Sequence, residues 1–300
     1  MAPKFQKVSG STVNPILHND HFIAHDGIRL PLRVWSPEKA DRPRAIIIAL
    51  HGFNDYSNFF HAPGSYFAKK NIISYAYDQR GFGNTVNRGI WPGVSMLIKD
   101  VISLCNLVRS RHPGIPLFLF GESMGGGIAM VALKKNREHT RKLNLDGVIL
   151  AAPAVWGRET MPWYQNAALW VSAHTFPYAK LSGRGLKITA SDNLEMLRDL
   201  SRDPLVIKKT RIDTLYGLTN LMDQALNSAS SLNEPLLLLY GEKDEIIPKK
   251  PTMLMISRLP QVTQKKRKVI LYKRGYHMLL RDLQSQVVWQ DIDAWIEDHQ

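Results

Sequence analysis

The stretch Leu117-Phe118-Leu119-Phe120-Gly121-Glu122-Ser123-Met124-Gly125-Gly126-Gly127 gives the clearest indication of how this chain folds. An apolar run typical of a buried strand leads into G-x-S-x-G, and residues 126–133 have a pattern typical of a helix. Strand, sharp turn and helix are the setting of a nucleophile elbow, whose serine hydroxyl projects from the sheet on a strained turn. Glycines flank the serine because a Cβ there would clash with the neighbouring strand and helix. The helix directs its free N–H groups at the place where negative charge would develop.

Further apolar segments on both sides of this stretch predict the rest of a sheet. Strands are predicted at residues 22–24, 30–35, 45–50, 72–77, 117–120, 148–151, 236–240 and 269–272. The first two would form a hairpin through the turn signal Asp26-Gly27, and helical segments separate most of the others. This alternation predicts an α/β fold, in which helices cover both faces of a mostly parallel central sheet.

One interval, residues 153–231, breaks the alternation and is too long for an ordinary loop in a compact domain. Helical patterns occupy residues 163–171, 194–200 and 212–226. Ser191 or Asp192 is expected to be the N-cap of the second helix, and Asp203-Pro204 its end. We therefore expect a helical cap inserted into the core. The expected division is an N-terminal arm (1–20), an α/β core (21–152 and 232–300) and a cap or lid (153–231).

The expected cap is rich in aromatic residues, namely Trp156, Trp163, Tyr164, Trp170, Phe176 and Tyr178. Most of them are expected to fill the core of the cap itself. The alternative is that at least two of them line an apolar pocket above Ser123.

A serine hydroxyl becomes a good nucleophile only when a histidine takes its proton and a carboxylate orients that histidine. In open parallel sheets such groups lie on loops at the carboxyl ends of strands. Of the ten histidines, His277 fits best, because it follows the last predicted strand on a loop before the C-terminal helix. Asp244, just past the preceding strand, is the preferred acid, with Glu242 and Glu245 as rivals by position.

A tetrahedral intermediate also needs two backbone N–H donors for its oxyanion. One candidate is Met124, which directly follows Ser123. The other is Phe53, in the loop after strand 45–50, where Gly52 permits the turn that aims this N–H inward.

Composition restricts the class of protein. The chain has 300 residues, of which 44% are hydrophobic and 22% charged, as is usual for a soluble globular protein with a large core. No apolar run approaches the roughly 20 residues of a membrane span, and residues 1–7 show no secretory signal. The single cysteine, Cys105, has helical packing spacing and favours a reducing, cytoplasmic location. No zinc spacing or phosphate loop is present, so no metal and no cofactor are expected.

The net charge of +13 favours contact with anionic membrane surfaces or anionic substrates. The basic residues include the groups Lys134-Lys135, Arg141-Lys142, Lys208-Lys209, Lys249-Lys250 and Lys265-Lys266-Arg267-Lys268. No nucleic-acid module accompanies them, so no nucleic-acid partner is expected. Peripheral contact with an anionic membrane is therefore the expected partner interaction, and the sequence indicates no oligomeric state.

Five segments together resemble the successive motifs of the α/β-hydrolase superfamily. They are residues 51–53, 77–83, 121–127, 241–244 and 275–277. More narrowly, they resemble the monoacylglycerol lipase and lysophospholipase branch, often grouped under a serine aminopeptidase-like domain. The resemblance covers about residues 22–297, and the order serine, acid, histidine is that of the α/β-hydrolase fold. It implies that Asp78 and Arg80 fix a loop. Relatives often have histidine where this chain has Glu122, whose charge needs a partner.

The expected activity is hydrolysis of carboxylic esters without a cofactor. Ser123 would attack the acyl carbonyl, His277 would accept and return the proton, and Asp244 would orient His277. The resemblance suggests a monoacylglycerol or lysophospholipid as the small-molecule substrate.

Two alternatives to ester hydrolysis remain open. An aminopeptidase-like amide hydrolase on the same fold would call for an acidic pair in the cap to hold a substrate ammonium. The available carboxylates are Glu159, Asp192, Glu195 and Asp199. A non-catalytic binding protein on this fold would show a broken triad.

Overall fold

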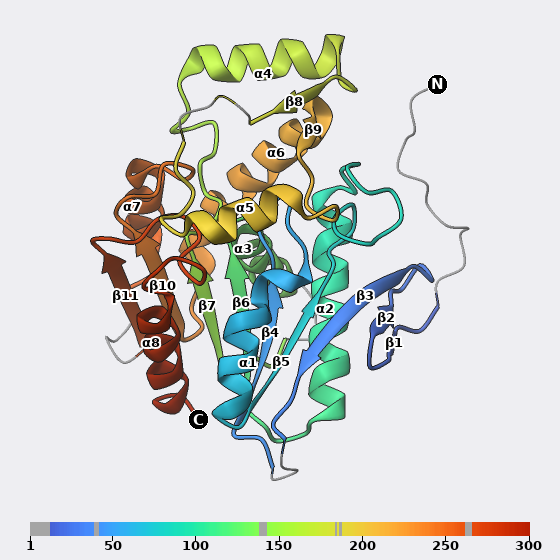
Figure 1. Ribbon diagram of the computed structural model, residues 1–300, viewed down its shortest axis with the longest axis vertical. Coiled ribbons are helices and arrows are strands. Elements are labelled where there is room, and N and C mark those ends of the chain that lie inside the picture. The colour runs from blue at the N-terminus through green and yellow to red at the C-terminus, as the bar shows by residue number, and fades with distance from the viewer. Residues whose placement is uncertain (1–12, 39–41, 138–142, 184, 186–187, 262–265) are drawn as a thin grey trace.

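The computed structural model describes residues 13–38, 42–137, 143–183, 185, 188–261 and 266–300. Its centre is a nine-stranded sheet with the order β1-β2-β3-β5-β4-β6-β7-β10-β11 (Figure 1). The strands are β1 (Ile16–Leu17), β2 (His21–Ile23), β3 (Arg29–Trp35), β4 (Ala45–Leu50), β5 (Ile72–Tyr77), β6 (Leu117–Glu122), β7 (Gly147–Ala151), β10 (Leu236–Gly241) and β11 (Arg267–Tyr272). Neighbouring strands pair in parallel along the order β5-β4-β6-β7-β10-β11, and they pair antiparallel along β1-β2-β3-β5. The prediction of a mostly parallel α/β sheet is confirmed.

Helices cover both faces of this sheet. They are α1 (His61–Lys69), α2 (Val94–Arg111), α3 (Met124–Arg137), α7 (Lys249–Arg258) and α8 (Ser285–Glu297), with short 3₁₀ helices η1 (Ser57–Phe60) and η2 (Ala229–Ser231). The six residues of β4 are all buried, and they alternate between two apolar clusters. Ile46 and Ile48 pack with α2 and α3, whereas Ile47 packs with α1 and α8. Burial of each isoleucine stabilises the fold by about 1.5–3 kcal/mol.

The segment between β7 and β10 lies beyond the carboxyl ends of the parallel strands (Figure 1). It forms α4 (Trp163–Thr175), β8 (Lys180–Ser182), α5 (Leu194–Arg202), β9 (Lys209–Arg211) and α6 (Ile212–Ser228). The three helices follow the predicted patterns. The antiparallel pair β8–β9 was not expected, because three-residue strands carry too few residues to show a period. The N-cap of α5 is Asn193, whose side chain accepts the Met196 N–H, so the prediction of Ser191 or Asp192 was wrong.

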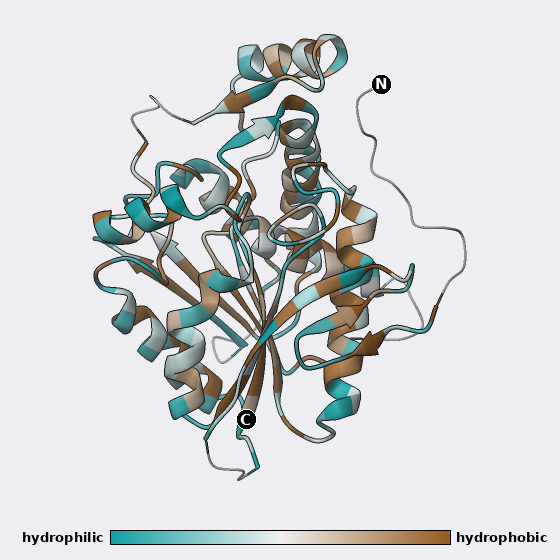
Figure 2. Ribbon diagram, turned by 45° about the vertical axis from the view of Figure 1, so that its right-hand side comes forward, coloured by the Kyte–Doolittle hydropathy of each residue, from teal (hydrophilic) through white to brown (hydrophobic). Residues whose placement is uncertain are grey.

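Five of the six aromatic residues singled out in this segment are exposed, so the expectation that they fill an apolar core was wrong. Trp163 is 80% exposed and Phe176 69%, and Tyr164, Trp170 and Tyr178 are also exposed. No residue of α4 is buried, because this helix packs on α6 by one side only and has no described layer outside it. Figure 2 shows hydrophobic residues along α4 at the outer end of the molecule.

Two further expectations concern the chain ends and the membrane. Part of the expected N-terminal arm forms the edge strand β1, while residues 1–12 lie outside the described residues, as do Arg141, Lys142 and Lys265 of the basic groups. Among the described residues, no helix combines the length and the apolar character that crossing a membrane requires.

Candidate active site

The turn between β6 and α3 has the geometry of a nucleophile elbow. Ser123 occupies this turn with a φ of 52°, a left-handed conformation that strains a residue with a side chain. A Cβ at Gly125 would lie 2.2 Å from the Leu50 carbonyl oxygen, and one at Gly121 would lie 2.5 Å from the Gly125 oxygen. The two glycines are therefore required by close packing of this turn against β4 and against the start of α3.

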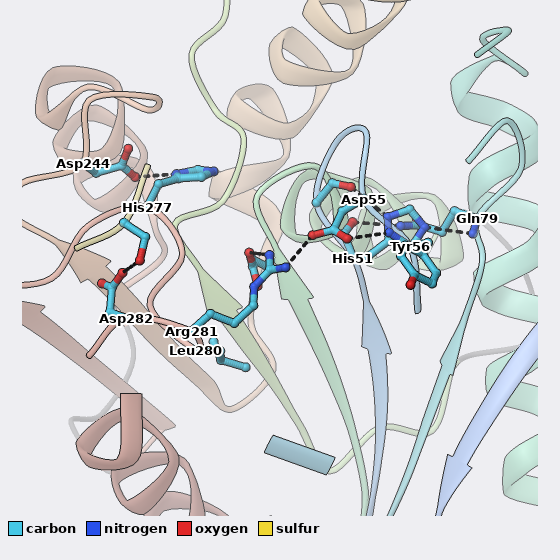
Figure 3. A network of polar contacts seen from close by, with 12 residues as sticks. His51, Asp55, Tyr56, Gln79, Asp244, His277, Leu280, Arg281 and Asp282 are labelled. Carbon is cyan, nitrogen blue, oxygen red and sulfur yellow. Dashed lines mark hydrogen bonds and ion pairs between the residues drawn. The ribbon is translucent and has the colours of Figure 1, made fainter. Parts of the chain in front are cut away.

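His277 and Asp244 meet at the carboxyl ends of the last two strands. His277 Nδ1 donates to Asp244 Oδ2 over 2.7 Å (Figure 3). The other carboxylate oxygen accepts the backbone N–H groups of Ile246 and Ile247 at 2.8 and 2.9 Å. Asp244 is thus fixed by its own loop and in turn fixes the imidazole. Both side chains are almost fully buried, at 0% and 6% exposure.

The rival acids contact other groups. Glu242 forms an ion pair with Lys249 at 3.1 Å, and Glu245 accepts the Thr189 backbone N–H at 2.7 Å. Both glutamates are exposed. Of the three carboxylates considered, Asp244 is the one that the structure places against His277.

Burial and neighbouring charge shift the pKa of His277 in opposite directions. Burial lowers the pKa of an imidazole, but the negative charge of Asp244 and its hydrogen bond outweigh this and raise the pKa of His277 above its usual value. Because Nδ1 donates to Asp244, Nε2 is the ring atom left to accept a proton.

Ser123 and His277 line one cavity of about 460 Å³. Most of its wall is apolar, and the segment between β7 and β10 contributes Trp156, Met161, Leu169, Leu215, Leu218 and Met222 to it. Of the six aromatic residues of the expected cap, Trp156 alone lines this cavity. The alternative that at least two of them line the pocket was therefore also wrong. The sequence could not predict which residues of α6 line the cavity. Periodicity shows that a helix has an apolar side, but it does not show what that side packs against.

The loop after β4 carries Phe53 at the edge of the same cavity. Within the described residues, the backbone N–H groups of Phe53 and Met124 donate no hydrogen bond. The loop is held by His51, whose Nδ1 donates to the Gly52 oxygen (2.8 Å) and whose Nε2 accepts the Gln79 N–H (3.0 Å; Figure 3). Burial lowers the pKa of His51, so it serves as a neutral structural residue.

Asp78 and Arg80 fix the loop after β5, as the resemblance implied. Asp78 accepts the backbone N–H groups of Ser57 and Asn84 at 3.0 and 2.8 Å. The buried Arg80 pairs with Asp100 at 2.5 Å and with Asp26 at 2.7 Å. Cys105 is buried in α2 and its burial raises its pKa to about 12, which confirms a packing role.

The mostly parallel sheet, the strained serine turn and the buried histidine–aspartate pair define an α/β-hydrolase. The family model described as serine aminopeptidase, S33 matches residues 41–284, and the chain belongs to this family.

Relatives cover nearly the whole chain. A monoacylglycerol lipase of Mycolicibacterium smegmatis is 26% identical over 93% of this chain and 96% of its own length. Human monoglyceride lipase is 24% identical over 92% of this chain and 89% of its own length. Monoglyceride lipase of Saccharomyces cerevisiae, solved as a soluble variant with a substrate analog, superposes with a TM-score of 0.76 at 21% identity, covering 99% of both chains. These comparisons indicate a carboxylic ester hydrolase.

Proposed function

We propose that this protein hydrolyses monoacylglycerols through an acyl-enzyme formed on Ser123, with residues 153–231 as a cap over the site. One observation carries the proposal: Ser123 and His277 line the same largely apolar cavity, and Asp244 binds the other side of the imidazole. The relatives described above are monoacylglycerol lipases, which favours a monoacylglycerol over a lysophospholipid.

The chemistry follows from these positions. His277 Nε2 takes the Ser123 proton as the serine oxygen attacks the ester carbonyl, and Asp244 stabilises the imidazolium that results. The N–H groups of Phe53 and Met124 stabilise the oxyanion, and His277 then protonates the leaving glycerol oxygen. Water, activated by the same histidine, releases the fatty acid.

The cap carboxylates do not support amide hydrolysis at this site. Glu159 pairs with Arg258 at 2.5 Å, and Asp192 accepts the Leu283 N–H at 2.9 Å. Glu195 and Asp199 line an adjoining cavity of about 550 Å³ beside α5, which shares Asp55 and Arg281 with the Ser123 cavity. None of the four is among the described residues that line the Ser123 cavity.

The carboxylates that do line the Ser123 cavity, among the described residues, are Asp55 and Glu122. Both are paired with Arg281. A substrate ammonium would have to compete with this arginine for them, which favours an uncharged acyl ester over an aminoacyl amide.

A substrate panel tests the acyl site. We expect wild-type protein to prefer medium- and long-chain monoacylglycerols over lysophospholipids and over aminoacyl amides. Leu218→Trp should lower kcat/KM for long chains by about tenfold or more, because pocket volume discriminates acyl groups at roughly this level. Acetate esters should be affected little.

Val171→Trp is the matched control, because Val171 lies on the exposed side of α4. The proposed acyl site would be contradicted if both variants lost kcat/KM for long chains equally. It would also be contradicted if aminoacyl amides were the best substrates.

We also propose that the outer face of α4 contacts an anionic membrane. Trp163 and Trp170 are exposed there, and tryptophan favours the boundary between lipid and water. A neighbouring cavity of about 470 Å³ has a strongly cationic lining. Its basic residues are Arg88, Lys180, Lys208, Lys209 and Arg211.

Flotation with vesicles tests this contact. Lys180→Ala/Lys209→Ala should weaken binding to anionic vesicles about 30-fold, since each lysine near such a surface contributes about 1 kcal/mol. Binding should fall with added salt and be weak on neutral vesicles. Lys249→Ala/Lys250→Ala, on α7, is the control, and an equal loss there would show that only net charge matters.

A further inference from the structure

A buried carboxylate lies directly beside the proposed nucleophile. Glu122 precedes Ser123 and is 2% exposed, so water cannot stabilise its charge. Its partner is Arg281, whose Nη2 donates to Oε1 over 3.0 Å. Arg281 is four residues beyond His277 and belongs to the same loop before α8.

The other arm of the same guanidinium reaches the loop that carries Phe53. Nη1 of Arg281 lies 2.7 Å from Asp55 Oδ2, while Asp55 Oδ1 accepts the Tyr56 backbone N–H at 2.8 Å (Figure 3). The side chains of Arg281 and Asp55 are 10% and 8% exposed. One largely buried arginine therefore joins the serine turn, the Phe53 loop and the histidine loop, segments that are far apart in the sequence.

We propose that Arg281 is a positioning residue, whose forked guanidinium holds the Phe53 N–H and the Ser123 turn at the spacing that the oxyanion requires. The proposal rests on the acyl-enzyme mechanism proposed above. Only arginine suits this position, because its planar fork can donate to two carboxylates at once, whereas a lysine ammonium is a single point of charge. Loss of the arginine would leave two buried carboxylates without a cation.

The charges of Glu122 and Arg281 also shift the pKa of His277. Asp244 and Glu122 raise the pKa of His277, and Arg281 lowers it. Asp282 lies on the same loop, where it accepts the Ser191 hydroxyl and the Tyr276 N–H. His277 must be neutral to act as a base, so a higher pKa moves the acid limb of the kcat/KM profile to higher pH.

Three variants separate positioning from charge. Arg281→Gln should lower kcat by about 100-fold, the effect of a lost oxyanion donor, with KM for a short ester little changed. It should also move the acid limb to higher pH, whereas Glu122→Gln should move it to lower pH. Arg281→Lys keeps the charge but not the fork, so it should lose kcat while its acid limb stays near that of the wild type.

Arg80→Gln is the matched control, because Arg80 likewise pairs with two carboxylates, those of Asp26 and Asp100, but lies outside the Ser123 cavity. Rates are measured per active site titrated with a fluorophosphonate, so that unfolded protein does not count. If Arg281→Gln does not fold, Arg281→Lys and Asp55→Asn test the proposal instead. Both variants should show the same loss of kcat. Wild-type kcat per titrated site in the Arg281 variants would overturn the proposal. Failure of the mechanism itself would look different, because wild-type protein would then not be labelled at Ser123.

Discussion

Ser123→Ala should lower kcat for ester hydrolysis by about 10⁴–10⁶-fold, because the proposed acyl-enzyme forms on the Ser123 hydroxyl. The fold should persist, since alanine removes one oxygen from a turn whose shape depends on Gly121 and Gly125. The remaining rate would come from the oxyanion donors and from substrate binding. The measurement is hydrolysis of a medium-chain nitrophenyl ester and of a monoacylglycerol.

Labelling by a fluorophosphonate gives a second readout of the same variant. Wild-type protein should be labelled at Ser123, and Ser123→Ala should not be labelled. Ser65→Ala, in α1, is a control that should keep both activity and labelling. Activity near the wild-type level in Ser123→Ala would refute the proposed nucleophile, and an unlabelled wild-type protein would revive a non-catalytic role for the fold.

Asp244→Asn should lower kcat by about 10⁴-fold while leaving the fold intact. The carboxylate accepts the proton of His277 Nδ1, which leaves Nε2 free to act as the base. An asparagine can present its NH₂ to Nδ1 instead, which favours the opposite tautomer and does not stabilise the imidazolium. The measurement is kcat for the same esters, normalised to folded protein.

Glu242→Gln is the control for this variant. Glu242 lies two residues from Asp244, yet it binds Lys249 on the surface. Its substitution should leave kcat within about threefold of the wild type, as is usual for an exposed ion pair worth less than 1 kcal/mol. A large loss of kcat in Glu242→Gln, together with little loss of kcat in Asp244→Asn, would reverse the assignment of the acid.

Much of the fold could be predicted because buried parallel strands are continuous apolar runs. Strand β4 and strand β5 begin and end where their sequence patterns do. The order of strands along the chain then placed Asp244 and His277 at neighbouring strand ends. The aromatics of α4 were misjudged because an amphipathic or apolar pattern does not show whether another layer covers it. The strands β8 and β9 were missed because each has only three residues.

The sequence by itself determined the local chemistry of the serine turn. The apolar run and the motif G-x-S-x-G suffice to predict the turn, and Gly121 is required by the turn itself, since a Cβ there would meet the backbone of Gly125. Gly125 is required because the turn packs against Leu50 of β4. The tertiary structure alone decided which distant groups meet there. Asp244 and His277 are 33 residues apart, and Glu122 and Arg281 are 159 apart. No periodicity spans such distances, and a buried charge takes its partner from whatever segment the folded core brings beside it.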